Sequence, residues 1–119
     1  MRKLLGLFIV LFFASTASAA ELTEPQKISA LLDAFATSDV TLVRNGEEHD
    51  GKYARKHFEE KLKQTKDVKT AEDFIAKVAT DSSHTGKPYI VKLKDGTQLE
   101  SAKWLHAKLK EIEAPKKAG

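Results

Sequence analysis

Two short segments of the chain carry side chains that could bind a ligand. Arg44 and Asn45 follow an apolar run, and a guanidinium in that place could hold a carboxylate or a phosphate in a two-pronged grip. The second segment, residues 82–89, is rich in hydroxyl groups, which both donate and accept hydrogen bonds. If the segments meet at one edge of a sheet, we expect a donor-rich cluster that favours an anionic or carbonyl-bearing ligand. The candidate binding residues are Arg44, Asn45, Ser82, Ser83, Thr85 and Tyr89.

The same residues also have purely structural interpretations. Arg44 could lie on the solvent side of a strand, and Asn45 could adopt a positive φ in a turn. The serine and threonine hydroxyls could cap a helix end or stabilise their own loop. Tyr89 could line a pocket or pack in the core.

Serine chemistry is the alternative function. Asp81-Ser82-Ser83-His84 contains the residue types of a hydrolytic triad, but neighbours in one loop cannot generally reach each other as nucleophile, base and orienter. The G-x-S-x-G elbow is absent from the sequence. A small serine hydrolase would therefore need Ser83 or Ser82 to act with the distant His57. For His57 itself we expect a neutral, half-buried ring hydrogen-bonded to a backbone group.

The sequence gives little support to metal, cofactor or thiol chemistry. None of its four histidines stands in a tight metal-binding pattern such as H-E-x-x-H. The chain has no cysteine, which excludes disulfides, thiolate ligands and thiol catalysis. We expect neither a metal nor a cofactor. A zinc site would have to draw on His49, His57, His84 and His106 with Glu47, Glu48 or Asp50, and three or four of them would have to converge.

The N-terminus has the three parts of a secretory signal peptide. Arg2 and Lys3 precede an apolar run, and small residues follow it. This run is about half of the ~20 residues that span a bilayer, so we expect cleavage rather than a stable membrane anchor. The predicted cut follows Ala19, with Ala20 as the alternative. The sequence thus predicts a signal peptide over 1–19 and a periplasmic protein.

Charge gives no indication of nucleic acid as a partner. The formal net charge of the precursor is +3 and falls to +1 when Arg2 and Lys3 are removed, since all acidic residues lie after the predicted cut. Acidic and basic residues alternate closely from 52 to 63, which is typical of a solvated helix face. A nucleic-acid surface would need positive charge gathered in one place.

Spacing of apolar residues predicts the elements that position the candidate site. Thr23 with Gln26, and Thr70 with Asp73, are capping-box pairs that start helices. A strand over 40–43 should end at the Asn45-Gly46 turn, followed by an acidic loop over 47–51 and a helix over 52–63. A hairpin over 89–100 should turn at Asp95-Gly96 through a two-residue type I′ loop.

The last predicted helix starts at Ser101, which we expect to cap it. Trp104 falls on its apolar face, so we expect Trp104 in the core. Together these elements predict an α+β fold, with about four helices packed on a small antiparallel sheet of two or three short strands. We expect one domain over 20–113 and a disordered tail over 114–119.

Several of these residues together carry a resemblance to a known family. They are Leu42-Val43-Arg44-Asn45-Gly46, then Ala54 and His57, Phe74-Ile75, Ser82-Ser83-x-Thr85-Gly86-x-Pro88-Tyr89, and Trp104-Leu105. In this order and spacing the sequence resembles the YfeK-like family of uncharacterised small periplasmic proteins of Gram-negative bacteria. The resemblance implies an exported domain and supplies no catalytic residues.

The function that we expect from the sequence is binding without turnover. The chain would be a periplasmic accessory module that captures a protein, a peptide, an envelope component or a small anionic ligand through the candidate binding residues. The sequence does not indicate an oligomeric state.

Overall fold

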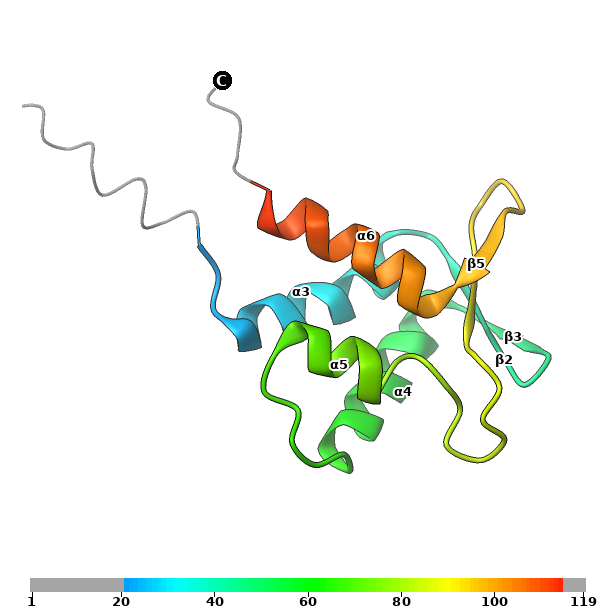
Figure 1. Cartoon of the computed structure of the whole chain (residues 1–119). Coiled ribbons are helices and arrows are strands. Elements are labelled where there is room, and N and C mark those ends of the chain that lie inside the picture. Colours follow the sequence, from blue (N-terminus) through cyan, green and yellow to red (C-terminus); the bar gives the residue numbers. More distant parts are fainter. Residues whose placement is uncertain (1–20, 115–119) are drawn as a thin grey trace, which may run out of the picture.

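The computed structural model describes residues 21–114 of the chain. The predicted signal peptide lies outside these residues, as does the predicted tail apart from Ala114. Four helices and four strands make up the described part, which confirms the predicted α+β class (Figure 1). Their order is α3 (Glu24–Thr37), β2 (Thr41–Arg44), β3 (Glu47–His49), α4 (Gly51–Lys63), α5 (Ala71–Lys77), β4 (Ile90–Lys92), β5 (Gln98–Glu100) and α6 (Ser101–Glu113).

The sheet has four strands, whereas we predicted two or three. Its strands lie in the order β3-β2-β4-β5, and every neighbouring pair is antiparallel. The unexpected strand is β3, which forms from the segment predicted to be an acidic loop. Asn45 and Gly46 both have positive φ, 51° and 83°, as a two-residue type I′ turn requires. This turn folds the chain straight back, so Glu47 pairs with Arg44 and the acidic residues become an edge strand.

The second hairpin turns differently from the prediction. Only Gly96 has a positive φ, whereas a type I′ loop needs two such residues. The amide of Gly96 donates to the carbonyl of Leu93, and the amide of Leu93 donates to the carbonyl of Thr97. The connection is therefore longer than two residues, and glycine takes the left-handed position after the turn. Asp95 does not have a positive φ, and its carboxylate accepts a hydrogen bond from the amide of Thr97.

Helix starts follow the predicted capping chemistry at two places and depart from it at a third. Thr23 with Gln26 and Thr70 with Asp73 form complete capping boxes. Asp50 caps α4 by accepting from the amide of Tyr53. The predicted cap at Ser101 is wrong, because Ser101 is already the first helical residue and its buried hydroxyl has no partner in the described part of the chain. The β5 strand runs directly into α6, which leaves no room for a separate capping residue.

The core lies between the helices and the face of the sheet that carries Leu42 and Val91, both fully buried. Phe35 of α3 sits near its centre, with ring centroids 5.1 Å from Phe58 of α4 and 5.0 Å from Trp104 of α6. Trp104 is 5% exposed, which confirms its predicted core position. Aromatic contacts thus tie three helices together in front of the sheet.

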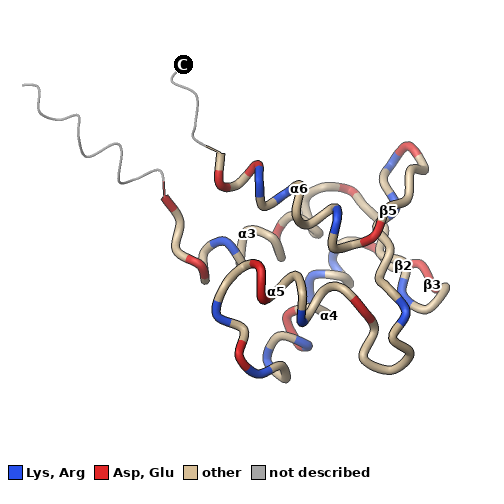
Figure 2. Tube along the Cα trace, viewed as in Figure 1, with Lys and Arg blue, Asp and Glu red and all other residues tan. Residues whose placement is uncertain are grey.

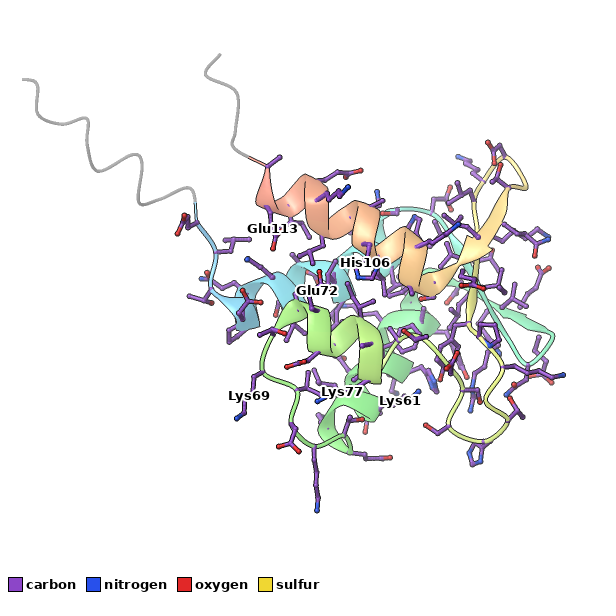
Figure 3. All side chains as sticks on the ribbon, in the orientation of Figure 1. Lys61, Lys69, Glu72, Lys77, His106 and Glu113 are labelled. Carbon is purple, nitrogen blue, oxygen red and sulfur yellow. The ribbon has the colours of Figure 1, made fainter. Side chains whose placement is uncertain are left out.

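The surface of the described part carries interleaved charges. Figure 2 shows lysine and arginine alternating with aspartate and glutamate along the helices and loops. His106 of α6 and Glu72 of α5 lie side by side across the gap between their helices, 2.8 Å apart (Figure 3). Near the two ends of the described chain, Lys27 forms ion pairs with Glu24 at 3.1 Å and with Glu113 at 2.9 Å. The second pair connects α3 to the C-terminal end of α6. Within residues 21–114, no helix has the length and apolar content that crossing a membrane requires.

Candidate functional site

One face of α4 carries polar and aromatic side chains toward the end of β2. Tyr53, His57 and Lys61 are spaced four residues apart and therefore share this face. The ring of His49, at the end of β3, stacks on Tyr53 with centroids 3.8 Å apart and planes 12° apart. Arg44, at the end of β2, donates from Nη1 to the Tyr53 hydroxyl at 3.0 Å. Tyr53 thus contacts the Arg44 guanidinium through its hydroxyl and the His49 imidazole through its ring.

Tyr89 connects this face to the core. Its ring packs edge-on against Phe58, with centroids 4.9 Å apart and planes at 88°, and the residue is 1% exposed. Its hydroxyl oxygen lies 3.0 Å from Nε2 of His57 and accepts from Nζ of Lys61 at 3.3 Å. Both interpretations of Tyr89 therefore hold: the ring belongs to the core, and the hydroxyl belongs to the polar cluster.

A pocket of about 200 Å³ opens over this cluster. We call it the Arg44 pocket. It lies between the end of β2, the polar face of α4 and the loop of residues 81–89 that leads into β4. The residues that line it are Arg44, His57, Glu60, Lys61, Gln64, Ser83, His84 and Tyr89.

Side-chain hydrogen bonds fix the 81–89 loop over the pocket. Asn45 donates from Nδ2 to the Ser82 hydroxyl at 3.3 Å and accepts from the Thr85 hydroxyl at 2.6 Å. The Ser82 hydroxyl also accepts from the amide of His84 at 3.3 Å. On the opposite side, Lys61 donates to the backbone carbonyl of Asp81 at 2.6 Å (Figure 3 labels Lys61 on α4). The loop is therefore held by the β2–β3 turn and by α4.

The two predicted segments do meet, and they divide into two groups. Val43 pairs with Ile90 in the antiparallel β2–β4 ladder, so the end of β2 lies beside the loop before β4. Arg44, Ser83 and Tyr89 line the pocket. Asn45, Ser82 and Thr85 do not line it, and they form the network that positions the loop. Their role in binding stays a prediction.

Arg44 and Lys61 are half-buried cations that form no ion pair in the described part of the chain, although the negative charge of Asp81 opposes the lowering of the Lys61 pKa. Six basic residues of the described chain are half-buried, and four of them pair with a carboxylate within 4 Å. The other two, Arg44 and Lys61, form no ion pair within residues 21–114, and both line the Arg44 pocket. The Nε atom of Arg44 is buried and has no hydrogen-bond partner in the same residues. The four paired residues are Lys27, Arg55, Lys92 and Lys108.

These charges and the burial of the cluster shift its titrations. Burial lowers the pKa of His57 from 6.5 to about 4, and the nearby positive charges of Arg44 and Lys61 lower it further in the same direction. Burial also lowers the pKa of the Lys61 ammonium and raises the pKa of the Tyr89 phenol. His57 is therefore neutral at pH 7, and its Nε2 can accept a hydrogen bond from the Tyr89 hydroxyl.

The partner of His57 differs from the one that we predicted. Its Nε2 faces the Tyr89 hydroxyl rather than a backbone group, because α4 places the ring against the start of β4. No hydrogen bond joins His57 to a serine in the described chain, and the Ser82 hydroxyl is held by Asn45. Nor do three or more histidine and acidic side chains converge in a metal-binding group anywhere in residues 21–114.

Sequence reasoning missed Glu60, Lys61 and Gln64, which line the pocket from α4. A signal for them was present. These residues continue the face that starts at Tyr53 and His57 at spacings of three and four residues, and a helix face of that kind next to an arginine-ending strand indicates a shared site. The alternating charges of α4 led us to interpret the whole helix surface as solvated, so this pattern was not recognised as part of a site.

Comparisons with known proteins give a family and a relative. The model of a family described as "Family of unknown function (DUF5329)" matches residues 22–113. The chain is 48% identical over 68 residues to the "Uncharacterized protein YfeK" of Salmonella typhimurium strain LT2, a stretch that covers 56% of this chain. The match spans 57% of that relative's own length. No solved structure matches the chain.

Proposed function

The chain belongs to the family of unknown function DUF5329, and from its own geometry we propose that it is a binding module whose Arg44 pocket holds an anionic group. The family match and the YfeK relative confirm the predicted YfeK-like resemblance. Neither description names an activity, so the proposal depends on the pocket alone.

The observation that carries this proposal is a pair of half-buried cations that form no ion pair within residues 21–114. Arg44 and Lys61 converge on one half-buried pocket without a carboxylate in contact, whereas the chain pairs its other half-buried cations. A buried charge is costly unless it is paired. An anion in the pocket would supply that partner through charge-assisted hydrogen bonds, and the guanidinium would orient it.

The surroundings of the two cations favour binding over turnover. The neutral His57 is engaged with Tyr89, and a histidine with a pKa of about 4 is a poor general base at neutral pH. The loop hydroxyls of Ser82 and Thr85 are used to hold the loop. We therefore prefer capture of a protein, a peptide, an envelope component or a small anion to hydrolysis.

We also propose that the domain works in the periplasm after removal of a signal peptide. This rests on the sequence of residues 1–19, with its basic start, short apolar run and small residues before the predicted cut.

NMR titration of the folded protein tests the anion site. We expect sodium propionate, added at constant ionic strength and pH 7.5, to shift the amide signals of Arg44, Lys61, Ser83 and Tyr89 along one saturating curve. Arg44→Gln should weaken this binding about tenfold or more, because a hydrogen bond between charged groups contributes roughly 1.5–3 kcal/mol.

Arg55→Gln is the matched control, because it removes the same charge from a cation that already pairs with Asp33 at 2.9 Å. It should leave the affinity within about twofold. If Arg44→Gln lowers the melting temperature strongly, Lys61→Gln provides a second test of the same pocket. The proposal fails if neither propionate, methyl sulfate nor sulfate shifts the pocket signals of the wild-type protein in a saturable way, or if Arg55→Gln weakens binding as much as Arg44→Gln.

A further inference from the structure

We propose that Lys61 captures a small 2-oxo acid covalently, by forming a reversible imine with its carbonyl group while Arg44 holds the neighbouring carboxylate. This inference rests on the proposed function and names the ligand class of the same Arg44 pocket. It follows from the hydrogen bonds of the Lys61 amine, from the groups packed around it and from its place beside Arg44 in one small pocket.

The hydrogen bonds of Lys61 fit a neutral amine. Its Nζ donates to the backbone carbonyl of Asp81 at 2.6 Å and to the Tyr89 hydroxyl at 3.3 Å, and these are its two acceptors in residues 21–114. An ammonium group has three N–H donors, whereas a neutral amine has two donors and a lone pair. Both donors of the neutral amine are therefore satisfied, and its lone pair is free to attack a carbonyl carbon.

Tyr89 is oriented to accept a hydrogen bond from Lys61. Its hydroxyl lies 3.0 Å from Nε2 of the neutral His57, which accepts the hydrogen bond that the phenol donates. Burial raises the pKa of the Tyr89 phenol, so the phenol keeps its proton near pH 7. The His57 ring is itself held between neighbours, parallel to Tyr53 within 6° and edge-on to Tyr89 at 71°. His57 is thus a positioning residue for the Lys61 amine.

The surroundings of Lys61 lower the pKa of its ammonium group. Burial is the main cause, the negative charge of Asp81 opposes the shift, and the positive charge of Arg44 adds to it. Asp81 contacts Lys61 through its backbone carbonyl and forms no ion pair with it. Lys27 is the contrasting case, because its two glutamate partners raise its pKa. A lysine of lowered pKa presents more of its neutral, nucleophilic form near pH 7.

Arg44 supplies the grip on the acid. A 2-oxo acid has its carboxylate bonded directly to the carbonyl carbon, so it needs a cation and a nucleophile in one small space. Arg44 and Lys61 line the same pocket of about 200 Å³, and the charge of Arg44 acts on both Lys61 and Tyr89. This volume lies below the roughly 300–1,000 Å³ that is usual for larger ligands. A planar carboxylate also matches the fork of a guanidinium.

The capture step needs no oxidant or reductant. The Lys61 ammonium releases one proton to solvent, and the neutral amine forms a C–N bond to the carbonyl carbon. The nitrogen passes a proton to the carbonyl oxygen, which takes a second proton from solvent and leaves as water while the C=N bond forms. The product is a protonated imine with the single positive charge that the lysine carried before. Water reverses the step and releases the acid unchanged, which is binding without turnover.

Reductive trapping with sodium cyanoborohydride at pH 7.5 tests this inference, because hydride converts the imine into a stable secondary amine that mass spectrometry locates. With pyruvate as the probe, Lys61 should be labelled about tenfold or more faster than Lys63, since a bound carboxylate holds the carbonyl group beside the amine. Sodium propionate should slow this labelling by competing for Arg44. It should not slow labelling by acetaldehyde, which has no carboxylate. Neither comparison needs a variant protein.

Two variants complete the test. Lys61→Arg keeps the positive charge and removes the nucleophile, so labelling in the pocket should disappear while an NMR titration with pyruvate still shows saturable binding. Lys63→Arg is the matched control on the same helix, because Lys63 is 72% exposed, pairs with Glu60 at 3.6 Å and does not line the pocket. It should leave the labelling of Lys61 unchanged.

The inference is overturned if pyruvate labels Lys61 no faster than Lys63, or if propionate leaves the rate of pyruvate labelling unchanged. Saturable NMR shifts of the pocket by pyruvate would then leave the proposed anion site intact. A wild-type protein that binds neither pyruvate nor propionate refutes the proposed function instead.

Discussion

Replacing His57 by glutamine should flatten the pH dependence of stability. The folded protein holds the pKa of His57 at about 4, whereas an unfolded chain restores the ordinary value of 6.5. As the pH falls below 6.5, His57 becomes protonated in the unfolded chain, whereas in the folded protein it stays neutral down to a pH of about 4. The free energy of unfolding therefore decreases on acidification through this window and is fully retained above it. Glutamine keeps a hydrogen-bond acceptor near Tyr89 and cannot titrate.

The size of the effect follows from the pKa difference of about 2.5 units. Each pKa unit corresponds to about 1.4 kcal/mol, so the full window is worth at most ~3.5 kcal/mol before the contact of the ring with water is taken into account. Between pH 7 and pH 5, the buried His57 ring should lower the free energy of unfolding by about 1–2 kcal/mol. This figure is reduced because the ring is partly in contact with water, which screens its charge. Measurements stop at pH 5 because Glu24, Asp73 and Asp95, whose pKa values are all lowered by hydrogen bonds, begin to contribute below it.

Urea unfolding at several pH values measures this directly, with the fluorescence of Trp104, the single tryptophan of the chain, as the probe. The wild-type protein should lose about 1–2 kcal/mol from pH 7 to pH 5, and His57→Gln should lose less than half of that. His84→Gln is the control, since His84 is an exposed histidine of the same pocket. It should follow the wild-type curve. Parallel curves for His57→Gln and the wild type would refute the reasoning about burial and charge at this site.

Three further predictions concern the core, the loop and the N-terminus. Trp104→Ala should cost roughly 3–5 kcal/mol of stability, measured by urea unfolding followed by circular dichroism, and an unchanged unfolding midpoint would contradict its core role. Asn45→Gly keeps the positive φ of the turn but removes both side-chain bonds to the loop, so hydrogen exchange at residues 82–86 should accelerate about tenfold or more, while Asn45→Asp, which can still accept from Thr85, should change it less. Export should remove nineteen or twenty residues, which mass spectrometry of the periplasmic protein can show; an intact Met1 form in the membrane fraction would be the contrary result.

Local chemistry was the part of the fold that the sequence made predictable. The capping boxes at Thr23 and Thr70 and the Asn45-Gly46 turn each depend on residues within four positions of one another. The Trp104 face of α6 was likewise visible as a repeat of apolar residues. Such features can be predicted from the sequence because the residues that form them are close together in the chain.

Elements that depend on distant partners escaped the same reasoning. The β3 strand, Glu47–His49, has no apolar alternation of its own and exists because the turn sets it beside β2. The role of Lys61 depends on Asp81 and Tyr89, which are 20 and 28 residues away. The hydrogen bond between Asn45 and the Ser82 hydroxyl joins residues 37 positions apart. Sequence therefore indicated the region of the candidate site and left open which of its residues face the pocket.

An anomalous-scattering crystal structure of the protein soaked briefly in sodium bromide tests the proposed anion site most directly. Bromide is a small monoanion that can be located without ambiguity and needs no knowledge of the natural ligand. Arg44 and Lys61, which form no ion pair in the described residues, predict a strong bromide peak in the Arg44 pocket, and its loss in Arg44→Gln crystals treated in the same way. Bromide peaks only at exposed lysines, with none in the pocket, would contradict the proposed function.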